Sequence, residues 1–359
     1  MVSRRQVLGG GLAVAAAPLL GASPLLAACS GGSGEPAASS GPVRRVRYLT
    51  SFGDTIREAF ALVANKTGIA AKYGVEFDVQ IGRGGAYNHG QLAAGSVELI
   101  AADSSGAFTR YANGTDTSFQ VVAAIHNKWP MALLGYADNG IRTPRDLNGR
   151  VIGIGEGTIA QRMWPAYARL TPGVDPDSVE VVPTDPATQV GQLISGQLDA
   201  IALFSVSAPG LSAAAGGREV TALPWADAFP DMYGNALVAN TTLIEEDPDL
   251  VRDAARALLD GLAWMLDHPD QAAQMWVEEV PEGDATSSAE EARQMADFCY
   301  GQLTDEPLGY LDRTRVVQQL ALLASVGEIT SDFNRALPDS DGNGGVINLN
   351  LLDWGGGQS

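Results

Sequence analysis

The stretch GIGEGTIAQ at residues 153–161 contains residue types and a spacing that could do chemistry. An apolar strand precedes it, and a glycine-rich turn that leads into a helix is typical of loops that hold a phosphate or a cofactor. The spacing excludes two such uses. The third glycine of a dinucleotide fingerprint would fall at Thr158, and no Lys-Ser or Lys-Thr pair completes a P-loop. We interpret the segment as a strand-to-helix turn that places Glu156, Gly157 and Thr158 where open α/β sheets bind ligands.

Little else in the sequence supports catalysis. The histidines His89, His126 and His268 are scattered without metal-ligand spacing, and no G-x-S-x-G nucleophile motif is present. Asp103 and Glu156 could form a carboxylate pair, but binding proteins use such groups to accept hydrogen bonds from ligand N–H groups. We therefore predict no catalytic residue, no cofactor, no metal ligand and no enzymatic activity.

Residues 339–344, DSDGNG, resemble the start of a calcium-binding loop. The bidentate acid expected at the twelfth position of such a loop is Asn350 here. A plain Gly/Asp turn before the apolar residues 346–349 is the favoured interpretation, and calcium binding is left open.

Turns after other predicted strands supply the rest of the candidate site. Residues 51–55 form the equivalent turn of the first half, and we expect it to face the turn at 156–158 across a cleft. Ser104 and Ser105 could instead cap a helix that begins near Ala107, and Trp129 could instead cover the edge of a lobe. The candidate ligand-binding residues are Ser51, Phe52, Asp54, Tyr87, Asp103, Ser104, Ser105, Asn127, Trp129, Glu156, Gly157, Thr158, Phe204 and Ser205.

An internal repeat indicates the elements that position these turns. Residues 90–100 read GQLAAGSVELI and residues 191–201 read GQLISGQLDAI, at an offset of 193 − 92 = 101 residues. Each copy predicts a helix stopped by glycine and followed at once by a strand. Upstream, residues 55–58 and 158–161 match capping boxes, with Thr as N-cap and Glu or Gln three residues on. Each half therefore predicts βαβ units with parallel strands, although α/β domains in general share such patterns.

Beyond the second copy the pattern predicts a short strand at 235–239 and then helices. A helix over 248–267 has Pro248 at its first position and an apolar stripe at helical spacing. Further helices are predicted over 271–279 and 313–325, and a capping box at Ser288–Glu291 predicts the start of another.

The first 28 residues predict export from the cytoplasm. Arg4-Arg5 precede an Ala/Leu-rich segment that glycine and proline interrupt, which is typical of a signal peptide and not of a spanning helix. The sequence leaves open whether the Tat or the Sec route is used. Residues 26–29, LAAC, resemble a bacterial lipobox, so we predict that Cys29 is lipidated. Residues 29–43 would then be a flexible tether, and the protein would reach the membrane only through its lipid anchor.

Charge and cysteine content limit the other partners. The formal net charge is −19, or −19 − 2 = −21 without Arg4 and Arg5, which argues against nucleic acid as a partner. With Cys29 lipidated, Cys299 has no partner for an internal disulfide. The length suffices for two domains with their own cores.

With these elements placed, the chain resembles the solute-binding proteins of ABC importers, in the branch that includes nitrate, sulfonate, taurine and thiamine-pyrimidine receptors. The resemblance is carried by the lipoprotein start, by LAAGSVE at 92–98, DLNGRVIG at 146–153 and LISGQLDA at 193–200, and by residues 240–251 with Trp264. It implies an α/β, two-lobed periplasmic-binding-protein-like fold of type II, in which each lobe is a mostly parallel sheet flanked by helices and two crossings join the lobes. Lobe one would comprise residues 44–136 plus 236–352, lobe two residues 137–235, and residues 353–359 a tail.

The resemblance also implies a function. A monomeric receptor would close its lobes on a small organic solute and deliver it to an ABC permease and its ATPase. Helix N-termini and Arg83 suit an anion such as a sulfonate, taurine or nitrate. Asp54, Asp103 and Glu156 instead favour a flat solute with N–H donors, such as a thiamine pyrimidine precursor, and this is the preferred expectation. A secreted enzyme on the same fold and a signalling receptor are the rival classes.

Overall fold

The structure, a computed structural model, describes residues 42–352 and 354, apart from residues 186, 301–305 and 343. The predicted export signal, Cys29 and the N-terminal part of the tether lie outside the described residues. Within the described part, no helix is both long enough and apolar enough to cross a bilayer.

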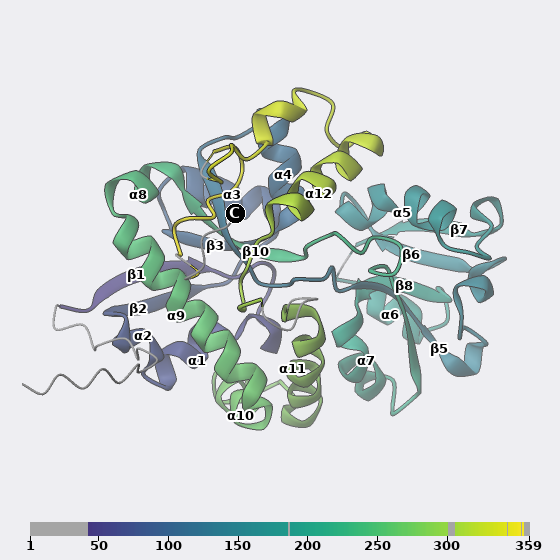
Figure 1. Cartoon of the computed structure of the whole chain (residues 1–359). Coiled ribbons are helices and arrows are strands. Elements are labelled where there is room, and N and C mark those ends of the chain that lie inside the picture. Colours follow the sequence, from purple (N-terminus) through teal and green to yellow (C-terminus); the bar gives the residue numbers. More distant parts are fainter. Residues whose placement is uncertain (1–41, 186, 301–305, 343, 353, 355–359) are drawn as a thin grey trace, which may run out of the picture. The chain divides into compact units, whose positions relative to one another are not determined.

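Ten strands form two five-stranded sheets in the described part of the chain (Figure 1). Sheet one has the order β2-β1-β3-β10-β4 and sheet two the order β7-β6-β8-β5-β9. The strands are β1 (Arg44–Leu49), β2 (Val75–Gln80), β3 (Leu99–Asp103), β4 (Phe119–Ala124), β5 (Met131–Tyr136), β6 (Val151–Gly155), β7 (Glu180–Thr184), β8 (Ala200–Phe204), β9 (Val220–Pro224) and β10 (Asn235–Asn240).

The two sheets share one topology. In sheet one, β1 pairs in parallel with β2 and β3, and in sheet two β6 pairs in parallel with β7 and β8, as the repeat predicts. One reversed strand, β10 in sheet one and β5 in sheet two, then pairs antiparallel with both of its neighbours. Four of the five strands in each sheet therefore run in the same direction, and the predicted fold class of two mostly parallel α/β lobes is confirmed.

The lobe boundary predicted at residue 136 needs correction. Strand β5 (Met131–Tyr136) pairs with β8 and β9, so it belongs to sheet two and not to lobe one. The first crossing accordingly runs between residues 124 and 131, and the second between residues 224 and 235. A strand of uninterrupted apolar residues carries no sign of which sheet it will join, because either core can bury it.

Helices cover both faces of each sheet (Figure 1). The α-helices are α1 (Phe60–Lys66), α2 (Ile69–Lys72), α3 (Gly85–Ala93), α4 (Ser104–Ala112), α5 (Ile159–Leu170), α6 (Gln189–Ile194), α7 (Ala208–Ala214), α8 (Thr241–Glu246), α9 (Pro248–Asp267), α10 (Pro269–Glu279), α11 (Ala285–Cys299) and α12 (Arg313–Ser325). Short 3₁₀ turns are η1 (Ile56–Glu58), η2 (Ala137–Asn139), η3 (Pro144–Leu147), η4 (Pro176–Ser178), η5 (Ser205–Ser207) and η6 (Phe333–Ala336). The helices predicted over 248–267 and 313–325 are confirmed at those bounds.

Alternating strand residues build the cores. One face of sheet one packs with α1 and α9, and the other with α3, α4 and α12. Sheet two packs with α5 on one face and with α6 and α7 on the other. The cluster that holds α4, α12 and α5 is continuous: it contains Val121 of β4, Ile152 of β6, and Trp129 of the first crossing. The two sheets are thus connected by apolar packing as well as by the chain.

Two of the predicted capping boxes are wrong. Thr55 makes no capping hydrogen bond, and its hydroxyl has no partner among the described residues; the Glu58 carboxylate, the other half of the box, accepts from Ser51 instead. Helix α11 begins at Ala285 and not at Ser288, since Asp284 caps it four residues earlier by accepting from Ser287 N at 2.7 Å. The Thr158 box is half confirmed: Thr158 Oγ1 accepts from Gln161 N, but the Gln161 amide oxygen accepts from Gly157 N.

Candidate functional site

The carboxyl edge of sheet one is held together by one buried amide side chain. Asn88, which is 0% exposed, donates from Nδ2 to the carbonyl oxygens of Thr50 at 2.8 Å, Ser51 at 3.1 Å and Ala101 at 3.2 Å. Its Oδ1 accepts from Arg83 N at 3.1 Å. A single residue of α3 therefore fixes the turns after β1 and β2 against β3, and its four bonds satisfy buried backbone groups that would otherwise destabilise this edge.

Gly82 permits the close approach of these two turns. A Cβ atom there would lie 1.7 Å from the Thr50 carbonyl oxygen, so no other residue fits. Gly82 N donates to Thr50 Oγ1 at 2.9 Å and Gly53 N donates to the Gly82 carbonyl at 3.0 Å. Phe52 and Arg83 form an isolated antiparallel bridge, so the two turns extend sheet one as a short ribbon.

This ribbon presents apolar side chains to solvent. Phe52 is 59% exposed, Ile81 45% and Tyr87 38%, whereas the great majority of large apolar residues in the described part are buried. The Arg83 guanidinium lies 5.1 Å from the centroid of the Tyr87 ring, a cation–π distance. We call Phe52, Ile81, Arg83 and Tyr87 the aromatic rim. It offers flat apolar surface beside a positive charge.

A polar network lies beneath the turn after β1. The carboxylate of Glu58 accepts from Ser51 N at 3.1 Å and from the Ser51 hydroxyl, and Asn235 Nδ2 donates to Ser51 Oγ at 2.9 Å. Burial raises the pKa of Glu58, and the two bonds from Ser51 and the charge of Arg57 oppose that rise. Asn235 N also donates to His126 Nδ1 at 3.2 Å, and burial lowers the pKa of His126 to about 3. His126 is therefore neutral at physiological pH.

The residues after β3 divide between exposed and buried roles. Asp103 is partly exposed and caps α4 by accepting from Gly106 N at 2.9 Å. Burial raises its pKa to about 6, and the Gly106 N–H and the charge of Arg162 oppose the rise. Ser104 and Ser105 are 0% exposed, and both hydroxyls accept from Gln319 Nε2 at 2.9 Å. The structure thus places the two serines in the packing of α4 against α12.

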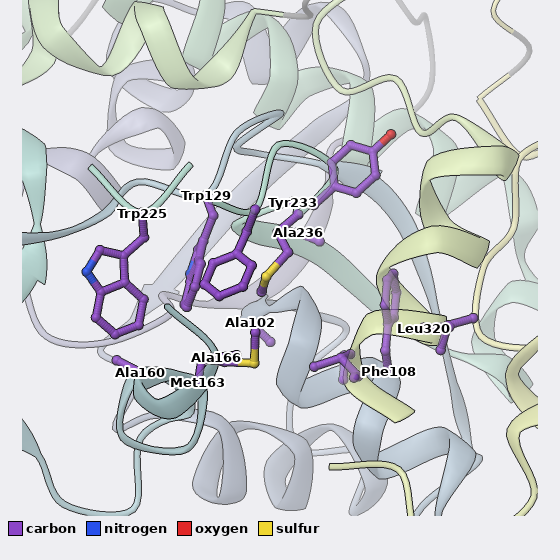
Figure 2. Packing of buried hydrophobic residues seen from close by; sticks show 14 of the residues in the cluster. Ala102, Phe108, Trp129, Ala160, Met163, Ala166, Trp225, Tyr233, Ala236 and Leu320 are labelled. Atoms are coloured by element: carbon purple, nitrogen blue, oxygen red, sulfur yellow. The ribbon is translucent and has the colours of Figure 1, made fainter. Parts of the chain in front are cut away.

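Asn127 and Trp129 are also buried, in the first crossing. Asn127 accepts from Arg315 Nη1 at 3.0 Å on its side chain and from Arg315 Nη2 at 2.6 Å on its carbonyl, and the Arg315 guanidinium lies 4.1 Å from the Tyr233 ring centroid. Trp129 is 0% exposed and packs edge-on against Trp225 of the second crossing, with centroids 5.5 Å apart. Figure 2 shows this pair beside Met163. Both tryptophans therefore belong to the apolar core in this structure.

At the carboxyl edge of sheet two, the turn after β6 is exposed. Glu156 and Gly157 are exposed and Thr158 is partly exposed, with Gly157 in the left-handed region at φ 70°. Ser205, in the 3₁₀ turn after β8, is buried and donates to the Pro130 carbonyl at 3.2 Å. Phe204 is partly exposed, and its ring is edge-on to His126 at 5.9 Å. Asp54, back in the turn after β1, is exposed and accepts from Trp276 Nε1 at 2.9 Å.

The interactions between the two lobes run crosswise. Arg57, next to the turn after β1, donates to Ser207 at 2.7 Å and lies 5.5 Å from the Phe204 ring centroid, beyond the end of β8. Arg162, next to the turn after β6, forms an ion pair with Glu328, and its charge opposes the rise that burial causes in the pKa of Asp103, at the end of β3. Asp103 and Phe204 are equivalent in the repeat, since 103 + 101 = 204. We expected the two first turns to face each other. That arrangement stays a prediction; the described contacts between the lobes are those of Arg57 with Ser207 and Phe204 and of Arg162 with Glu328.

Two features of the site were missed by sequence reasoning. The cross-lobe arginines Arg57 and Arg162 each lie shortly after a predicted turn, but their partners come from residues 207, 291 and 328, which no local pattern connects to them. Asn88 was not among the predicted site residues, and its burial was not foreseen. A polar residue at an inward helical position two turns before a stop glycine is the signal that could have found it.

The described residues contain no group of histidine, cysteine and acidic side chains arranged to hold a metal. In the segment that resembles a calcium loop, Asp341 N donates to Asp339 Oδ1 at 3.1 Å and Asn350 Nδ2 donates to the Asp341 carbonyl at 2.8 Å. These bonds are typical of an Asx-type turn.

Comparison with known proteins identifies relatives of this chain. Residues 57–272 match the sequence model described as NMT1/THI5 like. The riboflavin-binding protein RibY of Chloroflexus aurantiacus is 26% identical over 215 residues, which cover 59% of this chain and 60% of RibY, less than two thirds of its length. A putative binding protein of Brucella abortus is 25% identical over 244 residues, 64% of this chain and 69% of that protein.

Solved structures share the fold. The periplasmic aliphatic sulphonate binding protein SsuA of Escherichia coli aligns over 80% of this chain and 89% of its own, with a TM-score of 0.61 and 14% identity. DszB in complex with biphenyl-2-sulfinic acid aligns over 81% of this chain and 94% of its own, with a TM-score of 0.57 and 15% identity. At these identities the likeness extends to the fold alone.

Proposed function

This chain belongs to the NMT1/THI5-like family, and on that premise we propose that it is the extracytoplasmic solute receptor of an ABC importer. The aromatic rim is the observation that carries the proposal. Apolar rings at the carboxyl edge of a mostly parallel sheet occupy the position where open α/β sheets bind ligands. A chain with this fold and an export signal would capture a solute between its lobes and present it to a permease.

The proposed solute is a small, flat organic molecule with N–H donors. Phe52 and Tyr87 would stack on its faces, since aromatic side chains supply most of the apolar contact in such sites. Asp103 and Glu156 would accept its N–H groups, and the Thr158 hydroxyl and the free N–H groups at the start of α5 would orient it. RibY, described as a riboflavin-binding protein, is consistent with a flat heteroaromatic solute.

For the candidates whose polar groups are bonded within the protein, we propose an indirect role. Ser51 is engaged with Glu58 and Asn235, Ser104 and Ser105 with Gln319, and Asn127 with Arg315. These residues would hold the turns in place, whereas Phe204 would reach the solute from lobe two together with Glu156 and Thr158.

A small anion is the second candidate, and Arg83 favours it. Its guanidinium is exposed and stacks on Tyr87, and no carboxylate among the described residues forms a salt bridge with it. A guanidinium of this kind suits a sulfonate or carboxylate group. SsuA, described as an aliphatic sulphonate binding protein, shares the fold.

The proposal extends to location and partners. Lipidation at Cys29 would tether the receptor to the cell membrane, and the ABC permease with its ATPase would be its protein partner. The receptor would act as a monomer that binds solute without converting it.

A thermal-shift panel on the purified chain tests the function. Aminopyrimidines, flavins and aromatic amines form one arm, and sulfonates, taurine and nitrate the other. A true ligand at about a hundred times its Kd should add about 2.7 kcal/mol to the free energy of unfolding. Phe52→Ala and Tyr87→Ala should abolish the shift while leaving the midpoint without ligand unchanged, because both rings are exposed. Consumption of the ligand during incubation, followed by chromatography, would favour the rival enzyme.

A further inference from the structure

Each lobe extends an arginine to the other, and the two arginines occupy comparable places in the repeat. Arg57 lies in the 3₁₀ turn η1 that follows the turn after β1, and Arg162 lies in the first turn of α5, which follows the turn after β6. In the alignment of residues 55–58 with 158–161, Arg57 aligns with Ala160, so Arg162 lies two residues after the equivalent position. Arg57 contacts Ser207, which follows β8 of lobe two, and Arg162 contacts Glu328, which follows α12 of lobe one.

The Arg57 contact is the more buried of the two. Its side chain is 17% exposed and pairs within lobe one with Glu291 of α11, which is 13% exposed, at 3.3 Å. The same Nη1 atom donates to the hydroxyl of Ser207, in η5 of lobe two, at 2.7 Å. Glu291 lies against α7 as well, because a Cβ atom on Gly210 would be 2.6 Å from Glu291 Oε1. Burial raises the pKa of Glu291, and the charge and the hydrogen bond of Arg57 oppose that rise.

The Arg162 contact joins the lobes at a different place. Arg162 Nη1 donates to the Gly157 carbonyl of its own lobe at 2.9 Å, which aims the guanidinium out of α5. Its Nε forms a charge-assisted bond with Glu328, which follows α12 of lobe one and is 11% exposed. Each arginine is thus held by a bond within its own lobe and bonded to an acceptor in the other lobe. The two contacts together resist separation of the lobes more than either does alone.

We propose that Arg57 and Arg162 are positioning residues that hold the lobes in this arrangement and so set the fraction of the protein that adopts it. The consequence for the solute rests on the proposed function: a receptor that adopts its binding arrangement only part of the time binds with an apparent Kd weakened by that fraction. Ser207 and Glu328 are the acceptors through which the two arginines act across the lobes.

The test removes the acceptors and spares the arginines, because losing Arg57 would leave Glu291 buried without its counter-charge and could unfold the chain. Ser207→Ala and Glu328→Ala are made singly and together in a chain that also carries Cys29→Ser. Asp138→Ala is the matched control, since Asp138 pairs with Arg218 at 2.7 Å within lobe two. Spin labels on cysteines introduced at the exposed, repeat-equivalent positions Ala94 and Ser195 report the distance between the lobes, while Cys299 is buried.

Double electron–electron resonance on these proteins without solute gives the distribution of lobe distances. We expect the double variant to lower the ratio of short to long distances roughly ten- to thirtyfold, the effect of losing two ordinary net hydrogen bonds. Each single variant should lower it less, and Asp138→Ala should leave it unchanged. Distributions that coincide in the double variant and the unaltered chain would overturn the proposal. This readout needs no ligand. A thermal-shift panel in which no compound raises the midpoint would therefore refute the receptor function without affecting the proposed role of Arg57 and Arg162.

Discussion

Replacing Gly82 by alanine should dismantle the edge that carries the aromatic rim. An alanine Cβ at this position would lie 1.7 Å from the Thr50 carbonyl oxygen and 2.8 Å from Asn88 Nδ2. Because Cβ atoms keep at least 3.0 Å from such neighbours, the turn would have to move by 3.0 − 1.7 = 1.3 Å or more. That movement breaks the bonds of Gly82 to Thr50 and Gly53 and strains the bond from Arg83 N to Asn88. Two lost hydrogen bonds at about 1 kcal/mol each, together with the strained third, predict a loss of about 2–3 kcal/mol.

Gly85→Ala is the matched control for this change. Gly85 is the first residue of α3, its φ is not positive, and a Cβ atom there would meet nothing within 4 Å. Alanine should therefore be neutral or stabilise the protein by up to about 1 kcal/mol. Urea denaturation followed by far-UV circular dichroism measures both free energies of unfolding, provided that the slope with denaturant is unchanged. The steric reasoning fails if Gly82→Ala lies within about 0.5 kcal/mol of the unaltered protein or loses no more than Gly85→Ala.

Three further predictions concern Asp103, His89 and Trp225. Burial raises the pKa of Asp103 to about 6, so its ionisation opposes folding as the pH rises from about 4 through 6. In paired urea denaturations over that range, the free energy of unfolding of Asp103→Asn should rise relative to that of the unaltered protein. A difference that stays constant with pH would contradict this. Burial lowers the pKa of His89 to about 4, so the neutral imidazole contributes stability above about pH 6.5 that is lost as the pH falls. His89→Phe, with its ring against Phe119, should therefore lose less stability than the unaltered protein between about pH 7 and pH 5, and equal losses would contradict this prediction. Trp225→Ala should cost about 3–5 kcal/mol, because its ring stacks on Tyr167 with centroids 4.6 Å apart; a loss below about 1 kcal/mol in calorimetry would show that the cluster is not tightly packed.

The two lobes could be predicted because their signals are local. A glycine that stops a helix and an apolar strand directly after it lie within about ten residues of each other, and both copies of this pattern have positive-φ glycines at 95 and 196. The reversed strands could not be placed. β10 inserts between β3 and β4, and β5 joins a sheet whose other strands come later in the chain. Such pairings join residues that are between 200 − 135 = 65 and 239 − 99 = 140 positions apart, which a local pattern does not contain.

The candidate site was predictable to the same extent. Phe52 and Tyr87 were expected at turns after strands; Phe52 is exposed in its turn, and Tyr87 is exposed at the start of α3. The engagement of Ser104, Asn127 and Trp129 could not be predicted, because their partners Gln319, Arg315 and Trp225 come from distant segments. The capping box at Thr55 failed for a related reason: an acidic side chain that matches the motif found a better donor in Ser51.

The insertion of β10 has a consequence for how the chain folds in time. Sheet two uses strands from one uninterrupted stretch, residues 131–224. Sheet one lacks β10, which lies between β3 and β4, until residues 235–240 are available. As the chain becomes available from its N-terminus, β3 and β4 each present an open edge while all of sheet two is being added. Lobe two is therefore expected to fold completely before lobe one, although its strands come later in the chain. Strand β10 pairs last and completes sheet one, which also contains β1. A chain truncated before residue 240 would expose two unpaired strand edges, so truncation there should produce aggregation and not a stable single lobe.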